Sequence, residues 1–150
     1  EFQAATMADS ELLFVWRNDQ TAYQNFFNAQ PVTKAEHLEW LTKTLDNHNR
    51  YLFIILNQDQ PIGQVRFDIE GESAKISITL APNQRGQGLG GKTIVEATEY
   101  FLKQVPGMRT IIAEIKSDNQ ASLKAFTRAG YKPKNTNDVD SIVTLEFLKS

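Results

Sequence analysis

A glycine-rich stretch between a predicted strand and a predicted helix constrains this chain more than any other feature. The stretch reads Gln84-Arg85-Gly86-Gln87-Gly88-Leu89-Gly90-Gly91. An alternating run, Ile76 to Leu80, precedes it, and an apolar periodic segment begins at Lys92. The first turn of a helix leaves backbone N–H groups without partners, and glycine lets an anion come close to that backbone. The order therefore predicts a strand, a phosphate-binding loop and a helix.

The two most familiar glycine motifs for phosphate fit this stretch poorly. A P-loop requires G-x-x-x-x-G-K-[ST], and the spacing before Lys92-Thr93 is different. The order G-x-G-x-x-G is present, but the preceding strand carries Ser77 and Thr79 and is not a continuous apolar run. The simplest alternative is a glycine-rich turn that binds no ligand.

Two motifs together resemble the GNAT family of N-acetyltransferases. Arg85, Gly88 and Gly90 fit R-x-x-G-x-G, the acetyl-CoA loop of that family. Downstream, the run from Asn119 to Tyr131 fits N-x-x-[SA]-x-x-x-[YF]-x-x-x-G-[FY], the next motif of the family. The resemblance implies an α/β (α+β, mixed) fold, with one twisted mixed sheet of about six or seven strands and helices on both faces.

Length and composition agree with one enzyme domain. The 150 residues suit a single domain over 1–150, which the resemblance implies to be an N-acetyltransferase domain. The absence of cysteine excludes disulfides, thiolate metal sites and a cysteine nucleophile, and we expect no metal. The net charge of -2 argues against nucleic-acid binding. The chain begins at Glu1-Phe2 and not at Met, so these two residues suit a cloning remnant or a domain cut from a longer protein.

No apolar run approaches the ~20 residues of a membrane span, and no signal peptide is visible. We therefore expect a cytoplasmic protein without a membrane partner. The expected assembly is a monomer or homodimer, either fused to or working with other sugar-biosynthesis enzymes.

The remaining elements follow from periodicity and from turn residues. We expect helices after a cap at Asp9 or Ser10, from Thr33 with Glu36 as a capping box, from Gly91 to Pro106, and from Asn119 to Ala129. We expect strands over Phe2 to Thr6, Tyr51 to Leu56, Pro61 to Ile69, Ala74 to Leu80, Thr110 to Lys116 and Ser141 to Leu148, with a loop over 132–140. The second helix is expected to bury Leu38, Leu41 and Leu45, with His37 at the edge of that stripe.

The strands on either side of Glu70-Gly71-Glu72-Ser73 are expected to form a hairpin with one polar face. The polar side chains are Gln64, Arg66 and Asp68 on the first strand and Lys75, Ser77 and Thr79 on the second. At the edge of a sheet such a face is only solvated, whereas in the centre it would line a cleft. Because the glycine-rich stretch follows the second strand directly, we expect that strand to be central.

The resemblance implies how acetyl-CoA binds. The strand that ends at Leu80 and the strand that carries Glu114 would splay apart, with the pantetheine arm between them. Backbone groups near Ile78 and Leu80 would hold the arm and the thioester oxygen, and Lys124 or Arg128 would reach the outer phosphate. The implied cofactor-binding residues are Ile78, Leu80, Arg85, Gly86, Gln87, Gly88, Leu89, Gly90, Asn119, Lys124 and Phe126.

The proton-transfer groups are less clear. Many family members have a tyrosine that protonates the leaving thiolate where this chain has Phe126, so Ser122, Asn119 or a water would take that role, or the thiolate leaves unassisted. Tyr131 matches an apolar family position and is expected in the core. The candidate bases are Glu114 and His37, acting directly or through water. The simpler alternatives are an ion pair for Glu114 and packing on its own helix for His37.

The front half of the chain points to the acceptor. The runs Phe14 to Asp19 and His37 to Leu41 resemble N-acetyltransferases that act on nucleotide-linked amino sugars, as in pseudaminic acid biosynthesis, and more loosely those that act on ribosomal-protein N-termini. The expected acceptor is therefore a small-molecule amine, with a protein N-terminus as the alternative. A catalytically silent acyl-CoA-binding regulatory module is a third hypothesis.

Two kinds of side chain in the front half suit such an acceptor. Arginines would pair with a diphosphate, and aromatic rings, Phe27 among them, would stack on a base or a sugar face. The alternative for Arg66 is that it only balances Asp68 or Glu70. The predicted substrate-binding residues are Trp16, Arg17, His37, Trp40 and Arg66.

Overall fold

A computed structural model describes residues 1–24, 26, 30–85, 88–134 and 141–149 of the chain. These residues form a seven-stranded sheet with the order β1-β2-β3-β4-β5-β7-β6. The pairs are antiparallel except for the parallel pair of β4 with β5, which confirms the predicted mixed sheet. The strands are β1 (Phe2–Ala4), β2 (Arg50–Asn57), β3 (Gln60–Glu70), β4 (Ser73–Leu80), β5 (Thr110–Lys116), β6 (Lys132–Pro133) and β7 (Ile142–Leu148).

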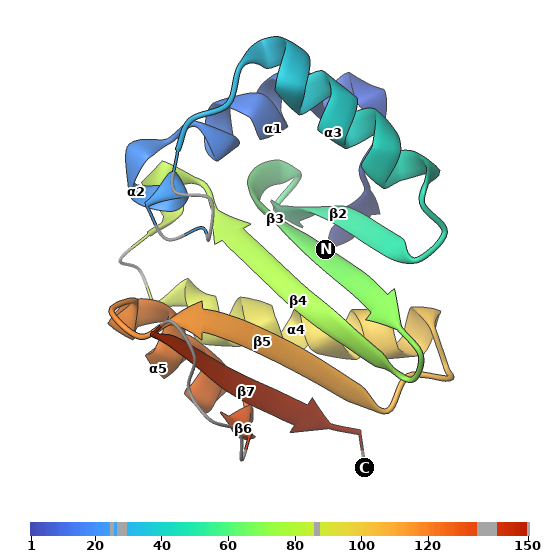
Figure 1. Ribbon diagram of the computed structural model, residues 1–150, viewed down its shortest axis with the longest axis vertical. Helices are drawn as coiled ribbons and strands as arrows, with labels where there is room; N and C mark the ends of the chain where they lie inside the picture. The colour runs from blue at the N-terminus through green and yellow to red at the C-terminus, as the bar shows by residue number, and fades with distance from the viewer. Residues whose placement is uncertain (25, 27–29, 86–87, 135–140, 150) are drawn as a thin grey trace.

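Helices lie on both faces of this sheet (Figure 1). The α-helices are α1 (Ser10–Arg17), α2 (Gln20–Tyr23), α3 (Lys34–Asp46), α4 (Leu89–Gln104) and α5 (Gln120–Arg128), and the two short 3₁₀ turns are η1 (Met7–Asp9) and η2 (Pro82–Gln84). The capping box of α3 is confirmed, because the Glu36 N–H donates to the Thr33 hydroxyl and the Thr33 N–H donates to the Glu36 carboxylate. The cap position predicted at Asp9 or Ser10 is confirmed, because Asp9 is the N-cap residue of α1, although its side chain makes no capping hydrogen bond to that helix. The Asp9 side chain instead completes the capping box of η1, whose N-cap is Thr6.

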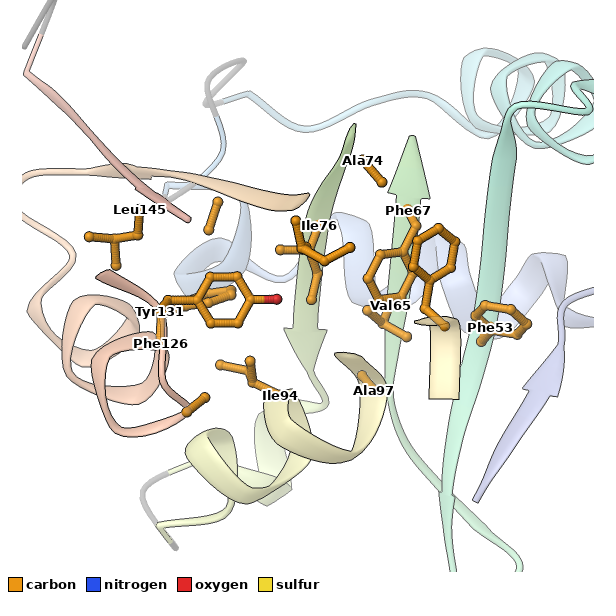
Figure 2. Packing of buried hydrophobic residues seen from close by; sticks show 14 of the residues in the cluster. Phe53, Val65, Phe67, Ala74, Ile76, Ile94, Ala97, Phe126, Tyr131 and Leu145 are labelled. Carbon is orange, nitrogen blue, oxygen red and sulfur yellow. The ribbon is translucent and has the colours of Figure 1, made fainter. Parts of the chain in front are cut away.

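Strand β2 shows how the two layers arise. Phe53 and Ile55 face one side and join the larger core, whereas Leu52 and Ile54 face the other side and join the smaller core. In the larger core, α4 and α5 pack on the sheet, and the rings of Phe67 and Phe101 stack with centroids 4.0 Å apart. Figure 2 shows this core from β2 to β7. The smaller core lies beneath α1 and α3, so each face of the sheet is closed by two helices.

The buried stripe of α3 differs from the prediction. The buried residues are His37, Leu41 and Thr44, while Leu38 and Leu45 are half-buried. The three buried positions are spaced by four and three residues, so they lie on one side of the helix. His37 therefore lies in the buried stripe and not at its edge. Leu45 flanks the stripe and packs against the smaller core.

The predicted hairpin and its central position are both confirmed. Strand β4 pairs along its whole length with residues 63–70 of β3, and β4 is the fourth of the seven strands. The polar side chains form three cross-strand pairs on one face, namely Gln64 with Thr79, Arg66 with Ser77, and Asp68 with Lys75. Leu52 and Ile54 pair with Arg66 and Gln64, so this polar face lies on the side that α1 and α3 cover.

Strands β4 and β5 separate after a short parallel contact. They pair only at Ser73–Lys75 with residues 110–112. Beyond that point β4 runs on to Leu80 and β5 to Lys116, and no further pair joins these two described strands. Figure 1 shows the two arrows diverging, while β5 stays paired with β7. The opening that the resemblance implies is therefore present, directly before the glycine-rich stretch.

Two details of the sheet escaped the sequence analysis. Strand β6 pairs with β7 inside the segment expected to be a loop, because two residues are too few for a visible alternation. A register shift also interrupts the β2–β3 pair between Ile55 and Leu56, opposite Gly63 and Pro61.

Candidate active site

The N-terminus of α4 forms one wall of the candidate site. Gly88 caps the helix with a φ of 71°, in the left-handed region that glycine adopts without strain. Glycine has no side chain to accept the first N–H groups of the helix, and the first turn of α4, which the structure describes, contains no acidic residue. These N–H groups and the helix dipole fit an anion such as a phosphate. Gly86 and Gln87 lie outside the described residues.

A shallow hollow lies beside this helix end. Its lining residues are Leu123, Lys124, Thr127 and Arg128 of α5. Helices α4 and α5 come close here, because a Cβ placed on Gly90 would lie 3.3 Å from the Cβ of Ala125. Lys124 and Arg128 therefore bring two positive charges next to the start of α4, as expected for an outer phosphate.

Arg85 is held between the end of β4 and the start of α2. One guanidinium nitrogen donates to the Asp19 carboxylate at 2.6 Å, and another donates to the Leu80 carbonyl at 3.1 Å. The hydrogen bond from Arg85 lowers the pKa of Asp19. Arg85 thus joins the end of β4 to the start of α2, although its role toward a phosphate stays a prediction.

The second motif folds as the start and the core of α5. The Asn119 side chain caps the helix by accepting the Ser122 N–H at 3.3 Å. Phe126 is only 4% exposed, and its ring packs edge to face against Tyr131 with centroids 5.0 Å apart. The Tyr131 hydroxyl is hydrogen-bonded to Thr98, and burial raises the pKa of Tyr131. Phe126 and Tyr131 thus both lie in the core, and the cofactor contact predicted for Phe126 stays a prediction.

Glu114 lies on β5 where the two strands begin to separate. Its carboxylate forms an ion pair with Lys75 of β4 at 2.8 Å, and this hydrogen bond raises the pKa of Lys75. The ion pair that the sequence analysis weighed against catalysis is therefore present. Glu114 is half-buried, and removing a proton from an amine would require it to exchange this partner for the substrate.

Three of the predicted substrate residues lie in a row above the polar face. The His37 and Trp40 rings have centroids 5.5 Å apart, and the Arg66 guanidinium lies 5.6 Å from the centroid of the Trp40 ring. Arg66 also forms an ion pair with Asp68 at 3.2 Å. The structure therefore brings His37, Trp40 and Arg66 together, with Arg66 already paired to a carboxylate.

The predicted residues on α1 have structural contacts. Trp16 is buried in the smaller core. Arg17 donates to the Gln30 carbonyl at 2.9 Å and lies 4.8 Å above the ring of Phe26. Phe27 lies outside the described residues. Trp16 and Arg17 therefore shape the segment that follows α1, and their contact with a substrate stays a prediction.

His37 is 4% exposed and lies between aromatic rings, with Phe14 of α1 on one side. Burial lowers the pKa of His37, and the charge of Arg17 lowers it further. The neutral ring is the form that accepts a proton, which suits a base if an amine or a water reaches it.

Acid is expected to destabilise the protein through His37. In the unfolded chain this histidine binds a proton near pH 6.5, whereas the folded protein resists that proton because the pKa is lowered. The free energy of unfolding should therefore fall as the pH drops below about 6.5. Urea unfolding between pH 7.5 and 5.5 measures this slope. His37→Phe should flatten it and His48→Gln, at an exposed position, should not; an equal slope in wild type and His37→Phe would contradict the assignment.

Asp19 and Lys116 make contacts that the sequence analysis did not anticipate, and it placed Lys75 on the polar face without its partner Glu114. Asp19 also accepts the Ala22 N–H at 3.0 Å and so caps α2. Aspartate is a favoured N-cap residue, so this cap could have been predicted from the sequence. Its partner Arg85 is 66 positions away, and no local pattern links the two. Among the described residues, no group of three or more metal-binding side chains could hold a metal ion, and no helix is long and apolar enough to cross a membrane.

Comparisons with known proteins agree with this geometry. Acetyltransferase PseH of Campylobacter jejuni subsp. jejuni serotype O:23/36 (strain 81-176) is 26% identical over 126 residues, which cover 83% of this chain and 78% of that protein. Spermidine N-acetyltransferase from Vibrio cholerae, solved with CoA and spermine, has a TM-score of 0.84 at 18% identity and covers 99% and 94% of the two chains. RimL, a ribosomal L7/L12 α-N-protein acetyltransferase solved with coenzyme A, has a TM-score of 0.82 at 15% identity, with 98% and 92% covered.

The two solved structures show a shared fold. The sequence profile described as "Acetyltransferase (GNAT) domain" matches residues 1–132, which include the opening between β4 and β5, the glycine-rich stretch and α5. The chain therefore belongs to the acetyltransferase (GNAT) domain family, and it is an acyltransferase.

Proposed function

We propose that this protein moves an acetyl group from acetyl-CoA directly to the primary amine of a nucleotide-linked amino sugar. The observation that carries this proposal is the opening between β4 and β5. It lies beside the start of α4, where no side chain caps the helix. The opening suits an extended arm, the N–H groups suit a pyrophosphate, and Lys124 and Arg128 suit a further phosphate. Membership of the acetyltransferase family supports the same reaction.

The reaction needs few groups from the protein. Bound acetyl-CoA supplies a thioester whose carbonyl carbon accepts the amine nitrogen. A C–N bond forms, the C–S bond breaks, and the proton lost by the amine is balanced by the proton gained by the thiol. His37 or Glu114 would accept the amine proton, directly or through water. Free N–H groups along β4, between Ile78 and Leu80, would donate to the thioester oxygen.

The nucleotide-linked acceptor follows from the charge and the rings near the polar face. Arg66 and Trp40 offer a guanidinium and an indole within 5.6 Å of each other, which suits a diphosphate next to a flat ring. The similarity to Acetyltransferase PseH over 126 residues supports an acceptor of this kind, because it agrees with the resemblance of the runs Phe14 to Asp19 and His37 to Leu41 to acetyltransferases of nucleotide-linked amino sugars. The fold likeness to RimL keeps a protein N-terminus as the alternative.

A screen for release of free thiol tests the acceptor. Purified protein with acetyl-CoA is offered nucleotide-linked amino sugars, peptides with ribosomal-type N-termini, and spermine. Thiol release fastest with an amino-sugar nucleotide is the expected result. Faster release with a peptide would promote the alternative, and no release with any amine, together with intact CoA binding, would favour the silent regulatory module.

Arg66→Ala tests the contact with the diphosphate. We expect the acceptor KM to rise about ten- to a hundred-fold, the size of a lost charge-assisted contact of ~1.5–3 kcal/mol, while the KM of acetyl-CoA stays unchanged. Steady-state kinetics with the best amino-sugar nucleotide measure both constants. Arg109→Ala is the matched control, since its ion pair with Glu72 is exposed and lies outside the polar face. Unchanged values of both constants would mean that Arg66 only pairs with Asp68.

A further inference from the structure

The short helix α2 is held at both of its ends. At its start, Asp19 accepts the Ala22 N–H at 3.0 Å and pairs with Arg85 at 2.6 Å. At its end, the Gln24 carbonyl accepts a hydrogen bond from the Lys116 side chain at 3.0 Å. Arg85 follows β4, and Lys116 is the last residue of β5. Helix α2 therefore bridges the far ends of the two strands that separate, and it lies across the mouth of their opening.

Two residues that precede α2 make contacts with the segment that follows it. The Asn18 side chain makes two hydrogen bonds of 2.8 Å with the backbone of Val32, which joins the end of α1 to the approach to α3. Arg17 donates to the Gln30 carbonyl in the same segment. Asp19 differs from these two because its partner belongs to the cofactor side of the site.

The Asp19–Arg85 pair also sets the charge beside the phosphate loop. Both side chains are largely shielded from solvent, with about a quarter exposed (23% and 27%), so screening by water is incomplete. The Asp19 carboxylate offsets the positive charge of Arg85 at the position where a pyrophosphate would arrive. Arg85 thus stabilises α2 at the expense of its attraction for phosphate.

We propose that Asp19 and Arg85 are a positioning pair, which fixes α2 at the mouth of the β4–β5 opening and thereby shapes the wall against which the acceptor binds. This inference rests on the proposed function, because it assigns the far side of the opening to the amine acceptor. The pair acts through α2, and neither its carboxylate nor its guanidinium takes part in proton transfer. Loss of the pair should weaken use of the acceptor and strengthen binding of coenzyme A. A general loss of structure would weaken both.

Asp19→Asn is the discriminating variant. Asparagine caps a helix as well as aspartate does, so the bond to the Ala22 N–H is kept and only the ion pair is lost. We expect kcat/KM for the amino-sugar nucleotide to fall about ten-fold. We expect the Kd of coenzyme A, measured by calorimetry, to fall about two- to five-fold, because a negative charge has left the phosphate loop and Arg85 is held only by neutral acceptors.

Two further variants complete the test. Glu11→Gln is the matched control, because it breaks an ion pair of the same 2.6 Å length with Lys34 on the exposed surface; both constants should stay at the wild-type values. Arg85→Lys keeps the charge but loses the planar fork that reaches Asp19 and Leu80 together, so it should share the acceptor defect. The double variant should be no worse toward the acceptor than either single variant if the pair acts as one unit.

The outcomes separate this inference from the proposed function. If wild-type protein acetylates no amino-sugar nucleotide, the proposed function fails, while the Kd of coenzyme A and the hydrogen exchange of the α2 amides still test the pair. Faster exchange of those amides in Asp19→Asn with tighter coenzyme A binding supports it. Weaker coenzyme A binding in Asp19→Asn, or α2 exchange equal to that of Glu11→Gln, would overturn it.

Discussion

Gly88→Asp is expected to abolish binding of acetyl-CoA without unfolding the protein. The aspartate would occupy the N-cap of α4, where its carboxylate accepts the N–H groups that the pyrophosphate needs and repels the phosphate charge. The apo fold should persist at a modest cost in stability, since the φ of 71° strains any side chain but aspartate is enriched at left-handed positions, and a Cβ here meets no atom within 4 Å. Blocking of the N–H groups and repulsion of the phosphate both weaken binding, so the loss of affinity for acetyl-CoA should be large.

Thermal unfolding measures this loss directly. Acetyl-CoA at a hundred times its Kd stabilises wild-type protein by about 2.7 kcal/mol, because it binds only the folded state. For a chain of 150 residues this corresponds to a rise in Tm of roughly 5–10 °C, and Gly88→Asp should show no rise. Gly88→Asn is the matched control, with the same shape and no charge, and should keep part of the shift. A full shift in folded Gly88→Asp would remove the start of α4 from the binding site.

Gly63→Ala is expected to destabilise the sheet where the opening begins. Gly63 lies on β3 opposite Leu80, and a Cβ there would lie 2.5 Å from the Thr79 carbonyl oxygen and 3.0 Å from the Leu80 Cα. Both are backbone atoms of β4, so the methyl group fits only if the strands move apart. On its other side Gly63 pairs with Ile55 of β2, next to the register shift between Ile55 and Leu56. Overpacking of this kind costs ~1–3 kcal/mol.

Urea unfolding of Gly63→Ala measures the cost, and acetyl-CoA binding shows whether the end of β4 has moved. We expect the free energy of unfolding to fall by ~1–3 kcal/mol and the Kd of acetyl-CoA to rise, because Leu80 is displaced from the opening. Gly107→Ala is the matched control, since a Cβ there meets no atom within 4 Å and alanine should be neutral or slightly stabilising. Equal stability of the two variants would show that β3 and β4 are not in close contact at this point.

The core and the candidate site were predictable from sequence to different degrees. Phe67 and Phe101 lie in periodic apolar segments, and their burial was predictable from the alternation of β3 and the repeat of α4, whereas the stacking of their rings was not. Helix α3 was also placed correctly by its capping box, yet its buried face was not, because Leu38 and Leu45 look more apolar than His37 and Thr44. Burial of His37 depends on the rings of Phe14 and Trp40, which only the packing of α1 on α3 supplies.

The sequence by itself determined the features that depend on neighbouring residues. Alternation specified the β3–β4 hairpin and its polar face, and the glycines specified the bare start of α4. Only the tertiary structure decided which distant groups meet. Asp19 and Arg85 are 66 positions apart, Lys75 and Glu114 face each other across two strands, and Arg66 shares Asp68 with Arg50. Charged side chains carry no periodic signal for their partners, because an ion pair depends on the distance between two chain segments that the fold alone brings together.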